Sequence, residues 1–348
     1  MKMIFPVIEV RNEEKQLLSD RNKGIDSLFE QEKENDARAL KPDSIRRATF
    51  LYGHWICNFK CPKYCYTRGT SDGVLTPDQT LKIIEQARSM GAKATYWPGE
   101  GELTLLKSFW DIMQYHAKTN LPAVLFTNGD IFQDNTISRR TLGIDSDVLI
   151  DKLNRNYPRL HLYLKFWHSN PEKAAEMAGV SKYPYQMIGK RSIPSSLAKL
   201  LTKTDKNRLG VEVMVSRENF EDAINNILPT IEELDLYAYV EPVIFSGNAK
   251  MKQGELALTP EQHHKLKEIF ASGGDYCEKR QSTELIVKGT MLTPGIAIPP
   301  RPEDSILNID GSIKDVFEVF HNPYFRKMRK LSEQQGGCLC RNYWQNSK

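Results

Sequence analysis

The sequence predicts an α/β protein whose sheet is built mainly from parallel strands. Six short apolar segments, rich in β-branched and aromatic residues, alternate with amphipathic helical segments between about residues 48 and 245. Such alternation favours right-handed crossovers and therefore parallel strands. Periodicity alone leaves two architectures open, an open doubly wound sheet and a complete or partial barrel.

The individual elements follow from their composition and their boundary residues. The predicted strands cover residues 48–56, 93–99, 122–129, 159–167, 209–216 and 236–245. The predicted helices cover residues 76–92, 105–120, 138–156, 171–178, 194–203 and 219–234. Thr76 followed by Pro77 is typical of a helix start, because threonine caps the first turn and proline fits within it.

Two further regions flank this alternating body. Residues 1–47 are polar and charged, and we expect them to form an N-terminal helical extension. The body covers residues 48–250, and a smaller C-terminal unit covers residues 251–348. Around the junction, residues 246–258 look like a linker, a helix is expected over 259–272, and a hairpin over 283–295.

Composition narrows the classes of function. Of 348 residues, 40% are hydrophobic and 26% are charged, as in ordinary globular proteins. The 48 basic and 44 acidic residues nearly cancel, so we expect no nucleic-acid partner. The short apolar start is followed at once by charges, and no apolar stretch approaches the ~18 residues of a membrane span. We therefore expect a cytoplasmic protein with no membrane partner.

Three of the six cysteines lie within nine residues, in the stretch CNFKCPKYC. Cys57, Cys61 and Cys65 are separated by three residues each. In a reducing compartment such clusters are more often metal ligands or reactive thiols than disulfides. Three thiolates on one loop can hold three corners of a cubane iron–sulfur cluster and leave the fourth iron open. Zinc is the structural alternative, with His54 as a candidate fourth ligand.

Polar and glycine residues follow the predicted strands at the points where the strands end. They are Cys57, Gly99, Gly101, Glu102, Asn128, Ser169 and Ser216. Since parallel strands end at one edge of a sheet or barrel, we expect these residues to crowd one rim. His168 lies on the same rim and is a candidate catalytic residue.

Taken together in this order, the motifs resemble those of the radical S-adenosylmethionine (SAM) enzymes. The cysteine triplet, with Tyr64 before its last cysteine, resembles the cluster loop of that family, whose usual spacing is Cys-x3-Cys-x2-Cys. This chain has one more residue in the second gap. PGEGELTL (98–105) is similar to the family's glycine–glutamate motif, and FTNGD (126–130) and KFWHSNPEKAAEMAG (165–179) also resemble family loops.

The resemblance implies a partial (β/α)6 barrel that binds a 4Fe–4S cluster through Cys57, Cys61 and Cys65. SAM would bind the open iron and be cleaved reductively to a 5′-deoxyadenosyl radical. The resemblance also implies SAM-binding residues and an electron donor of the flavodoxin or ferredoxin type. Glu102 would contact the SAM amino group, and Ser169 its ribose or carboxylate. The other expected SAM-binding residues are Tyr64, Gly99, Gly101, Asn128 and Ser216.

The C-terminal unit resembles the SPASM or twitch extension of some radical SAM enzymes, most clearly over ILNIDGSIKDVFEVF (306–320). The resemblance implies an auxiliary iron–sulfur cluster, for which Cys277, Cys338 and Cys340 are the candidate ligands. A degenerate domain without a cluster is the alternative. In that case one thiol, for which Cys340 is the candidate, would donate a hydrogen atom to a product radical.

Three functions remain open at this point. The first is a radical SAM enzyme acting on a small polar metabolite such as a sugar, an aminocyclitol or a nucleoside-like compound. It is favoured because the segment before the first strand is shorter than a typical peptide-recognition domain. The second is a radical SAM enzyme that modifies a ribosomal peptide or a protein. The third is a zinc-stabilised binding protein without enzymatic activity.

Overall fold

The computed structural model describes residues 45, 47–51, 56–66, 68, 73–270, 284–295, 298 and 300–334. The predicted N-terminal helices lie outside the described residues. So do His54 and the candidate auxiliary ligands Cys277, Cys338 and Cys340.

An eight-stranded sheet forms the centre of the molecule, in the order β10-β9-β1-β2-β3-β4-β7-β8. Its strands are β1 (Arg47–Leu51), β2 (Ala94–Gly99), β3 (Ala123–Thr127), β4 (Leu160–Lys165), β7 (Leu209–Val215), β8 (Tyr237–Pro242), β9 (Glu284–Lys288) and β10 (Met291–Thr293). All neighbours pair in parallel except β9 and β10, which form the predicted hairpin. The six predicted strands are confirmed, and the sheet is consistent with a partial barrel.

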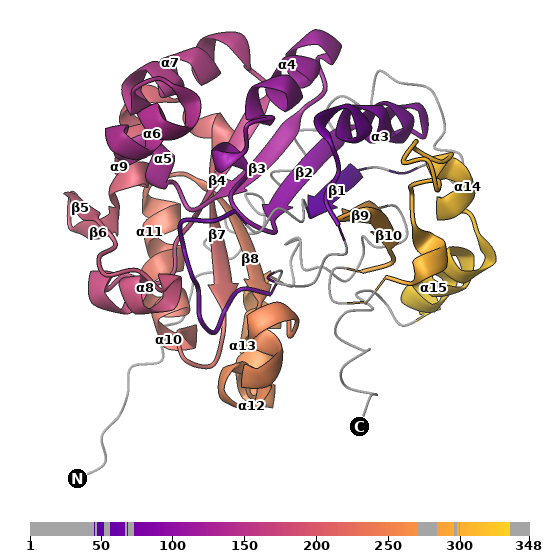
Figure 1. The fold of residues 1–348 in the computed structure, drawn as a ribbon. Coiled ribbons are helices and arrows are strands. Elements are labelled where there is room, and N and C mark those ends of the chain that lie inside the picture. The colour runs from indigo at the N-terminus through magenta and orange to yellow at the C-terminus, as the bar shows by residue number, and fades with distance from the viewer. Residues whose placement is uncertain are drawn as a thin grey trace, which may run out of the picture.

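Helices cover the outer face of this sheet (Figure 1). They include α3 (Pro77–Ser89), α4 (Phe109–Thr119), α8 (Pro171–Ala178), α9 (Ser195–Lys203), α11 (Leu228–Glu233) and α13 (Pro260–Phe270). The short helices α14 (Val316–Phe320) and α15 (Pro323–Gln334) lie beside β9 and β10 at one edge. Because β9 pairs with β1, the C-terminal region contributes to the same sheet as the body, and the boundary at residue 250 stays a prediction.

The two faces of the strands carry different side chains. On the outer face, Leu164, Val211 and Val213 join the helices in one large apolar core. On the inner face, a smaller cluster contains Tyr96, Phe126 and further tyrosines from β4 and β8. Alternation along each strand therefore sends aliphatic groups toward the helices and aromatic or polar groups into the barrel.

Two predicted segments differ from the structure. The single helix predicted over 138–156 is wrong, because Gly143 ends α6 (Asn135–Leu142) at φ 73° and Ser146 begins α7 (Ser146–Asn156). The linker predicted over 246–258 is instead a 3₁₀ segment, η4 (Gly247–Lys252), followed by α12 (Gln253–Leu256). These turns fold because Ala249 and Leu256 are buried against the cysteine loop's own apolar cluster.

The hairpin of β5 (Tyr185–Ile188) and β6 (Arg191–Pro194) was not predicted, although the glycine at its turn is a hairpin signal. Within the described ranges, none of the helices combines the length and the apolar run that crossing a bilayer requires.

The buried ring of His116 gives the fold a testable pH dependence. Its Nδ1 lies 3.0 Å from the Leu121 carbonyl oxygen, and its Nε2 lies 3.1 Å from Thr95 Oγ1. Trp97 Nε1 donates to the same Thr95 oxygen, so the threonine hydroxyl hydrogen is free for His116 Nε2 and the ring fits as a neutral Nδ1–H tautomer. Burial lowers the pKa of His116 to about 4.

Below the ordinary pKa of histidine, the unfolded state binds a proton that the buried ring in the folded state resists, so the free energy of unfolding falls. The contribution of His116 is fully present above the ordinary pKa of about 6.5 and is lost as the pH falls toward 4. We expect His116→Asn to remove up to about 1.4 kcal/mol per pH unit from the slope of unfolding free energy across that range. Urea titrations at several pH values measure the slope. His264→Asn, at an exposed position of α13, is the control, and an unchanged slope in His116→Asn would contradict the account.

Candidate functional site

The loop that carries the three cysteines is fixed by backbone hydrogen bonds on both sides. The amides of Lys60 and Cys61 donate to the Ala178 carbonyl at the end of α8, at 3.1 and 3.0 Å. The amide of Asn248 in η4 donates to the Cys65 carbonyl at 2.9 Å, and its side chain donates to the Cys61 carbonyl at 3.2 Å. The segment η4, part of the predicted linker, is therefore one of the two supports of this loop.

The contact between η4 and the loop requires a glycine. Gly247 has φ 52°, and a Cβ at this position would lie 2.7 Å from the Cys65 carbonyl oxygen. No larger residue fits there without moving the loop. Cys61 itself has φ 24°, an unusual backbone conformation for a residue with a side chain. Strain of this kind is concentrated at functional sites.

The thiols differ in exposure and charge environment. Cys57 reaches the surface, whereas Cys61 and Cys65 are half-buried. Desolvation by neighbouring protein atoms, followed by the Glu102 carboxylate, raises the pKa of the Cys57 thiol to about 12. Burial and the neighbouring cysteines raise the pKa of Cys61 still further, while Lys165 opposes the rise. A cation bound at these thiols, such as iron, would favour their thiolate forms.

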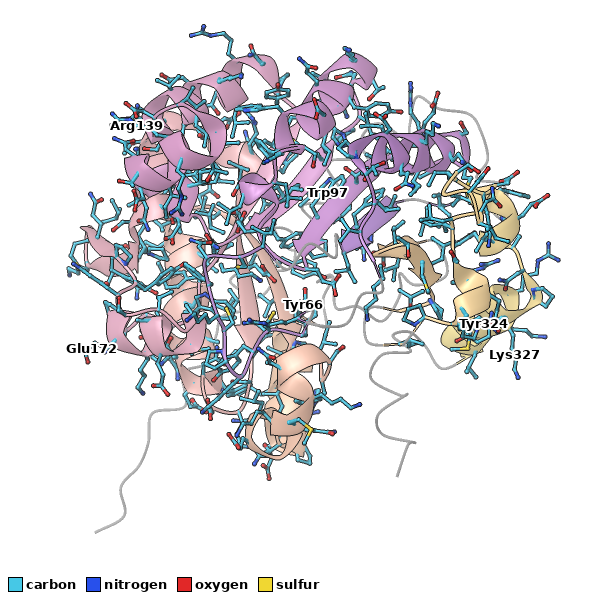
Figure 2. The ribbon with its side chains drawn as sticks, in the orientation of Figure 1. Tyr66, Trp97, Arg139, Glu172, Tyr324 and Lys327 are labelled. Carbon is cyan, nitrogen blue, oxygen red and sulfur yellow. The ribbon has the colours of Figure 1, made fainter. Side chains whose placement is uncertain are left out.

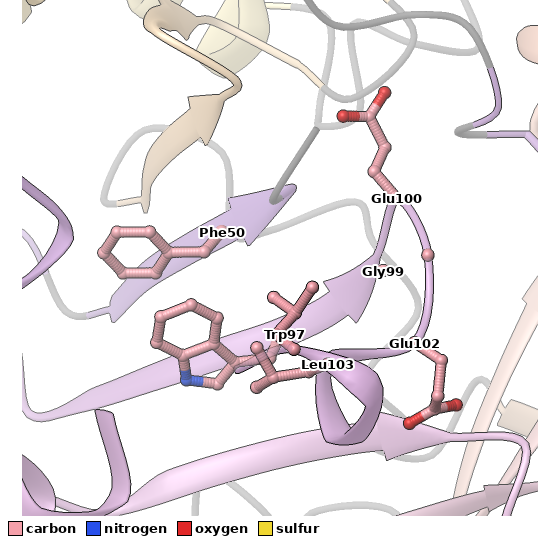
Figure 3. Close-up of a pocket in the computed structure, with 8 residues that line it drawn as sticks. Phe50, Trp97, Gly99, Glu100, Glu102 and Leu103 are labelled. Carbon is pink, nitrogen blue, oxygen red and sulfur yellow. The ribbon is translucent and has the colours of Figure 1, made fainter. Parts of the chain in front are cut away.

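The glycine–glutamate motif after β2 holds the rim together through the Glu102 carboxylate. Its Oε1 accepts from the hydroxyls of Thr104 at 2.8 Å and Thr127 at 2.9 Å, and Oε2 accepts from the Asn128 amide at 2.9 Å. Glu100 and Glu102 point to opposite sides of the loop (Figure 3). Burial raises the pKa of Glu102 even though these donors favour the carboxylate.

This motif also touches the segment that leads into the cysteine loop. The Glu102 amide donates to the Ile56 carbonyl at 2.8 Å. Gly101, at φ 108°, is required here, because a Cβ would lie 2.6 Å from the same oxygen. Gly99 has φ 134°, and Glu100 adopts φ 73°, in the left-handed region.

Asn128, after β3, connects the rim to the cysteine loop. Its side-chain amide donates to Asn58 Oδ1 at 2.7 Å and lies 4.0 Å from Cys57 Sγ. Asn58 in turn donates to Asp130 at 2.6 Å. The predicted residues Cys57, Glu102 and Asn128 thus form one continuous network.

Tyr64 and Ser216 lie on the other side of the cysteine loop. The Tyr64 hydroxyl donates to Glu218, which also accepts from Lys63 at 3.1 Å. Ser216 is fully buried, and both its amide and its hydroxyl donate to Asn219 Oδ1, at 2.7 and 3.0 Å. The structure therefore brings the end of β7 next to the loop, with both predicted residues engaged in structural hydrogen bonds.

Ser169 and His168 converge on the carboxylate of Asp222 at the end of α10 (Phe220–Asp222). The amide of Ser169 donates to Asp222 at 2.8 Å, and its hydroxyl donates to the other carboxylate oxygen. His168 Nδ1 accepts from the Asn170 amide at 3.0 Å and lies 3.1 Å from Asp222 Oδ2. Burial lowers the pKa of His168 and favours its neutral ring, although the Asp222 carboxylate opposes this shift.

Sequence reasoning missed a buried charge pair inside the barrel. Lys165 on β4 and Glu212 on β7 are register partners, and Lys165 Nζ lies 2.7 Å from Glu212 Oε2. Tyr66, labelled in Figure 2 near the centre of the molecule, is buried. Burial, and then the carboxylates of Glu241 and Glu212, raise the pKa of its hydroxyl. A charged residue at an inward position of a strand is the signal that would have found the pair.

Within the described part of the chain, three or more histidine, cysteine or acidic side chains do not gather into a site for a single metal ion. A cubane cluster takes each cysteine on a different iron, so its ligands need not converge on one point. The three thiols also act electrostatically on one another, and thiolates are the ligands that such a cluster takes.

Comparison with solved structures identifies the fold. The chain resembles SuiB from Streptococcus suis bound to precursor peptide SuiA, with 12% identity and a TM-score of 0.52 over 87% of this chain and 72% of that one. It also resembles anSMEcpe with bound AdoMet and the Kp18Cys peptide, with 14% identity and a TM-score of 0.52 over 82% and 83%. The chain therefore shares the fold of these radical SAM enzymes. Protein-family models and curated proteins gave no match.

The Glu102 network predicts a large loss of stability when the carboxylate is removed. In Glu102→Ala the buried donors of Thr104, Thr127 and Asn128 lose their acceptor. We expect the unfolding free energy to fall by about 2–4 kcal/mol, measured by denaturant titration. Glu85→Ala, on the exposed face of α3, should change it by no more than about 0.5 kcal/mol. Equal effects in the two variants would show that the network is not needed.

Proposed function

We propose that this protein is a radical SAM enzyme that modifies a peptide or protein substrate. The observation that carries the proposal is the three-cysteine loop, held open at the rim of a barrel whose fold is that of radical SAM enzymes. Bound to Cys57, Cys61 and Cys65, a 4Fe–4S cluster would supply the electron that cleaves SAM to a hydrogen-abstracting radical.

The protein's own groups have the tasks of ligation, orientation and exclusion of water. The three thiols would bind iron as thiolates, with their protons released to solvent, and the backbone hydrogen bonds to Ala178 and Asn248 hold their loop in place. Tyr64 and Trp167, whose ring centroids lie 6.1 Å apart, are buried in the same apolar cluster as Phe59 of the loop.

The SAM-binding residues are proposed from the sequence resemblance and their rim positions. Glu102 has both carboxylate oxygens engaged, so a SAM amino group would share Oε2 with the Asn128 amide. Ser169 donates to Asp222 and keeps its oxygen lone pairs for a ligand donor. Gly99 and Gly101 let the backbone approach SAM closely, and Tyr64, Asn128 and Ser216 complete the proposed set. His168 remains the candidate catalytic side chain, as a neutral ring.

The matched structures support a peptide substrate over the small polar metabolite that the sequence favoured. SuiB was solved with a precursor peptide, and anSMEcpe with the Kp18Cys peptide. An auxiliary cluster on Cys277, Cys338 and Cys340, a hydrogen-donating Cys340, and a flavodoxin or ferredoxin donor remain proposals from the sequence alone.

The cysteine ligands give the direct test of the enzymatic proposal. We expect Cys57→Ala, Cys61→Ala and Cys65→Ala each to abolish 5′-deoxyadenosine formation from SAM, because each removes one of three cluster ligands. Chromatography of anaerobic reactions with dithionite measures the product. Iron that remains in the triple variant would support the auxiliary cluster, and zinc alone in the wild type would support the binding protein instead. Undiminished SAM cleavage in any variant would refute the ligand assignment.

The substrate class has its own test. We expect a peptide encoded beside the gene to change mass when it is incubated with reconstituted enzyme, SAM and dithionite. The change should be absent without SAM and absent with the Cys61→Ala variant. Mass spectrometry detects it. Turnover of a sugar or nucleoside, with every neighbouring peptide unchanged, would restore the small-metabolite hypothesis.

A further inference from the structure

The inner wall formed by β4, β7 and β8 contains buried charged residues to which the proposed function assigns no role. Lys165 and Glu212 face each other across β4 and β7, and Glu241 lies on the neighbouring strand β8. Lys165 is largely buried, and Glu212 and Glu241 are buried. Although burial opposes its charged form, the Glu212 and Glu241 carboxylates and the nearby Cys61 raise the pKa of Lys165 above its ordinary value. One lysine on this wall is therefore flanked by two carboxylates.

Glu212 has one carboxylate oxygen without a hydrogen-bond donor. Oε2 accepts from Lys165, but Oε1 is buried and has no partner among the described residues. The residue is only 2% exposed. A buried acceptor left without a donor costs about 1–3 kcal/mol, and more when it belongs to a charged group. Folded proteins rarely carry such a cost without a reason.

Glu284 on β9 provides a contrast with Glu212. It is also an inward-facing, buried carboxylate paired with a cation, since Arg47 donates to its Oε2 at 2.8 Å. Its second oxygen, however, accepts from the hydroxyl of Thr49. The barrel therefore supplies a donor for each oxygen of one carboxylate and leaves the other carboxylate half satisfied.

The open oxygen lies near the proposed reaction centre. Charges on Lys165 and Glu212 act on the thiol of Cys61, and charges on Glu241 and Glu212 act on the hydroxyl of Tyr66. Both residues belong to the segment that carries the cysteine ligands. The buried charges of this wall therefore lie close to the cysteine loop.

We propose that Glu212 forms a subsite for a cationic side chain of the substrate peptide, a lysine ammonium. This inference rests on the proposed function, because it assumes a peptide substrate. An ammonium group would donate a charge-assisted hydrogen bond to Oε1 and place its positive charge between Glu212 and Glu241. A neutral side chain of the same length would leave the oxygen without a donor. The subsite would thus favour lysine over a neutral side chain, because a neutral side chain would leave Glu212 Oε1 buried without a hydrogen-bond donor.

Two small probes separate the charge of the lysine side chain from its length. They are Nα-acetyl-L-lysine N-methylamide and the neutral Nα-acetyl-L-norleucine N-methylamide, titrated calorimetrically into the full-length, reconstituted, SAM-bound protein. We expect the lysine probe to bind at least tenfold more tightly. In Glu212→Gln the two probes should bind within twofold of each other, and Glu212→Asp, which keeps the charge, should retain part of the preference.

Glu284→Gln is the matched control, since it neutralises a buried carboxylate whose oxygens already have donors. We expect it to keep the full tenfold preference. Equal binding of the probes by the wild type, or an unchanged preference in Glu212→Gln, would overturn the proposal and assign the open oxygen to water. A parallel loss of SAM affinity in Glu212→Gln would assign it to SAM instead. Since probe binding needs no turnover, its outcome is independent of whether 5′-deoxyadenosine is formed.

Discussion

The backbone hydrogen bonds that tie the cysteine loop to α8 and η4 are the constraint on which the site depends. They hold Cys61 at an unusual positive φ and fix the loop that carries all three thiols. Glycine at position 247 is what allows this approach. Without these hydrogen bonds, metal binding alone would have to order the loop, and the conformational entropy lost by each residue would weaken metal binding.

Buried carboxylates organise the rest of the rim. Glu102 joins the loops after β2 and β3, and Asp222 fixes the loop after β4. Both are surrounded by donors, so they act as structural anchors. Glu212 differs from these two, because it pairs with Lys165 through one oxygen while its Oε1 has no donor among the described residues. Glu102 and Asp222 therefore stabilise the loops of the site, whereas Glu212 is suited to bind the proposed lysine ammonium.

Much of the fold was predictable because its strands are short, apolar and evenly separated by amphipathic helices. The rim position of Glu102 and Asn128 followed from the rule that parallel strands end together. Three features escaped, two of them because their causes are tertiary. Residues 246–258 read as a linker, yet they fold where Ala249 and Leu256 meet the cysteine loop. The Lys165–Glu212 pair depends on the register of two neighbouring strands that are far apart in the sequence. The helix break at Gly143 has a local cause, a left-handed glycine cap that the sequence could have indicated.

The central claim is that three cysteines hold a cluster with one iron free for SAM. Electron paramagnetic resonance of the anaerobically reconstituted, dithionite-reduced protein tests it most directly. The account predicts a reduced 4Fe–4S signal whose shape changes when SAM is added, because the sulfonium compound binds at the open iron. A protein that shows no such signal, or a signal that is identical with and without SAM, would contradict it.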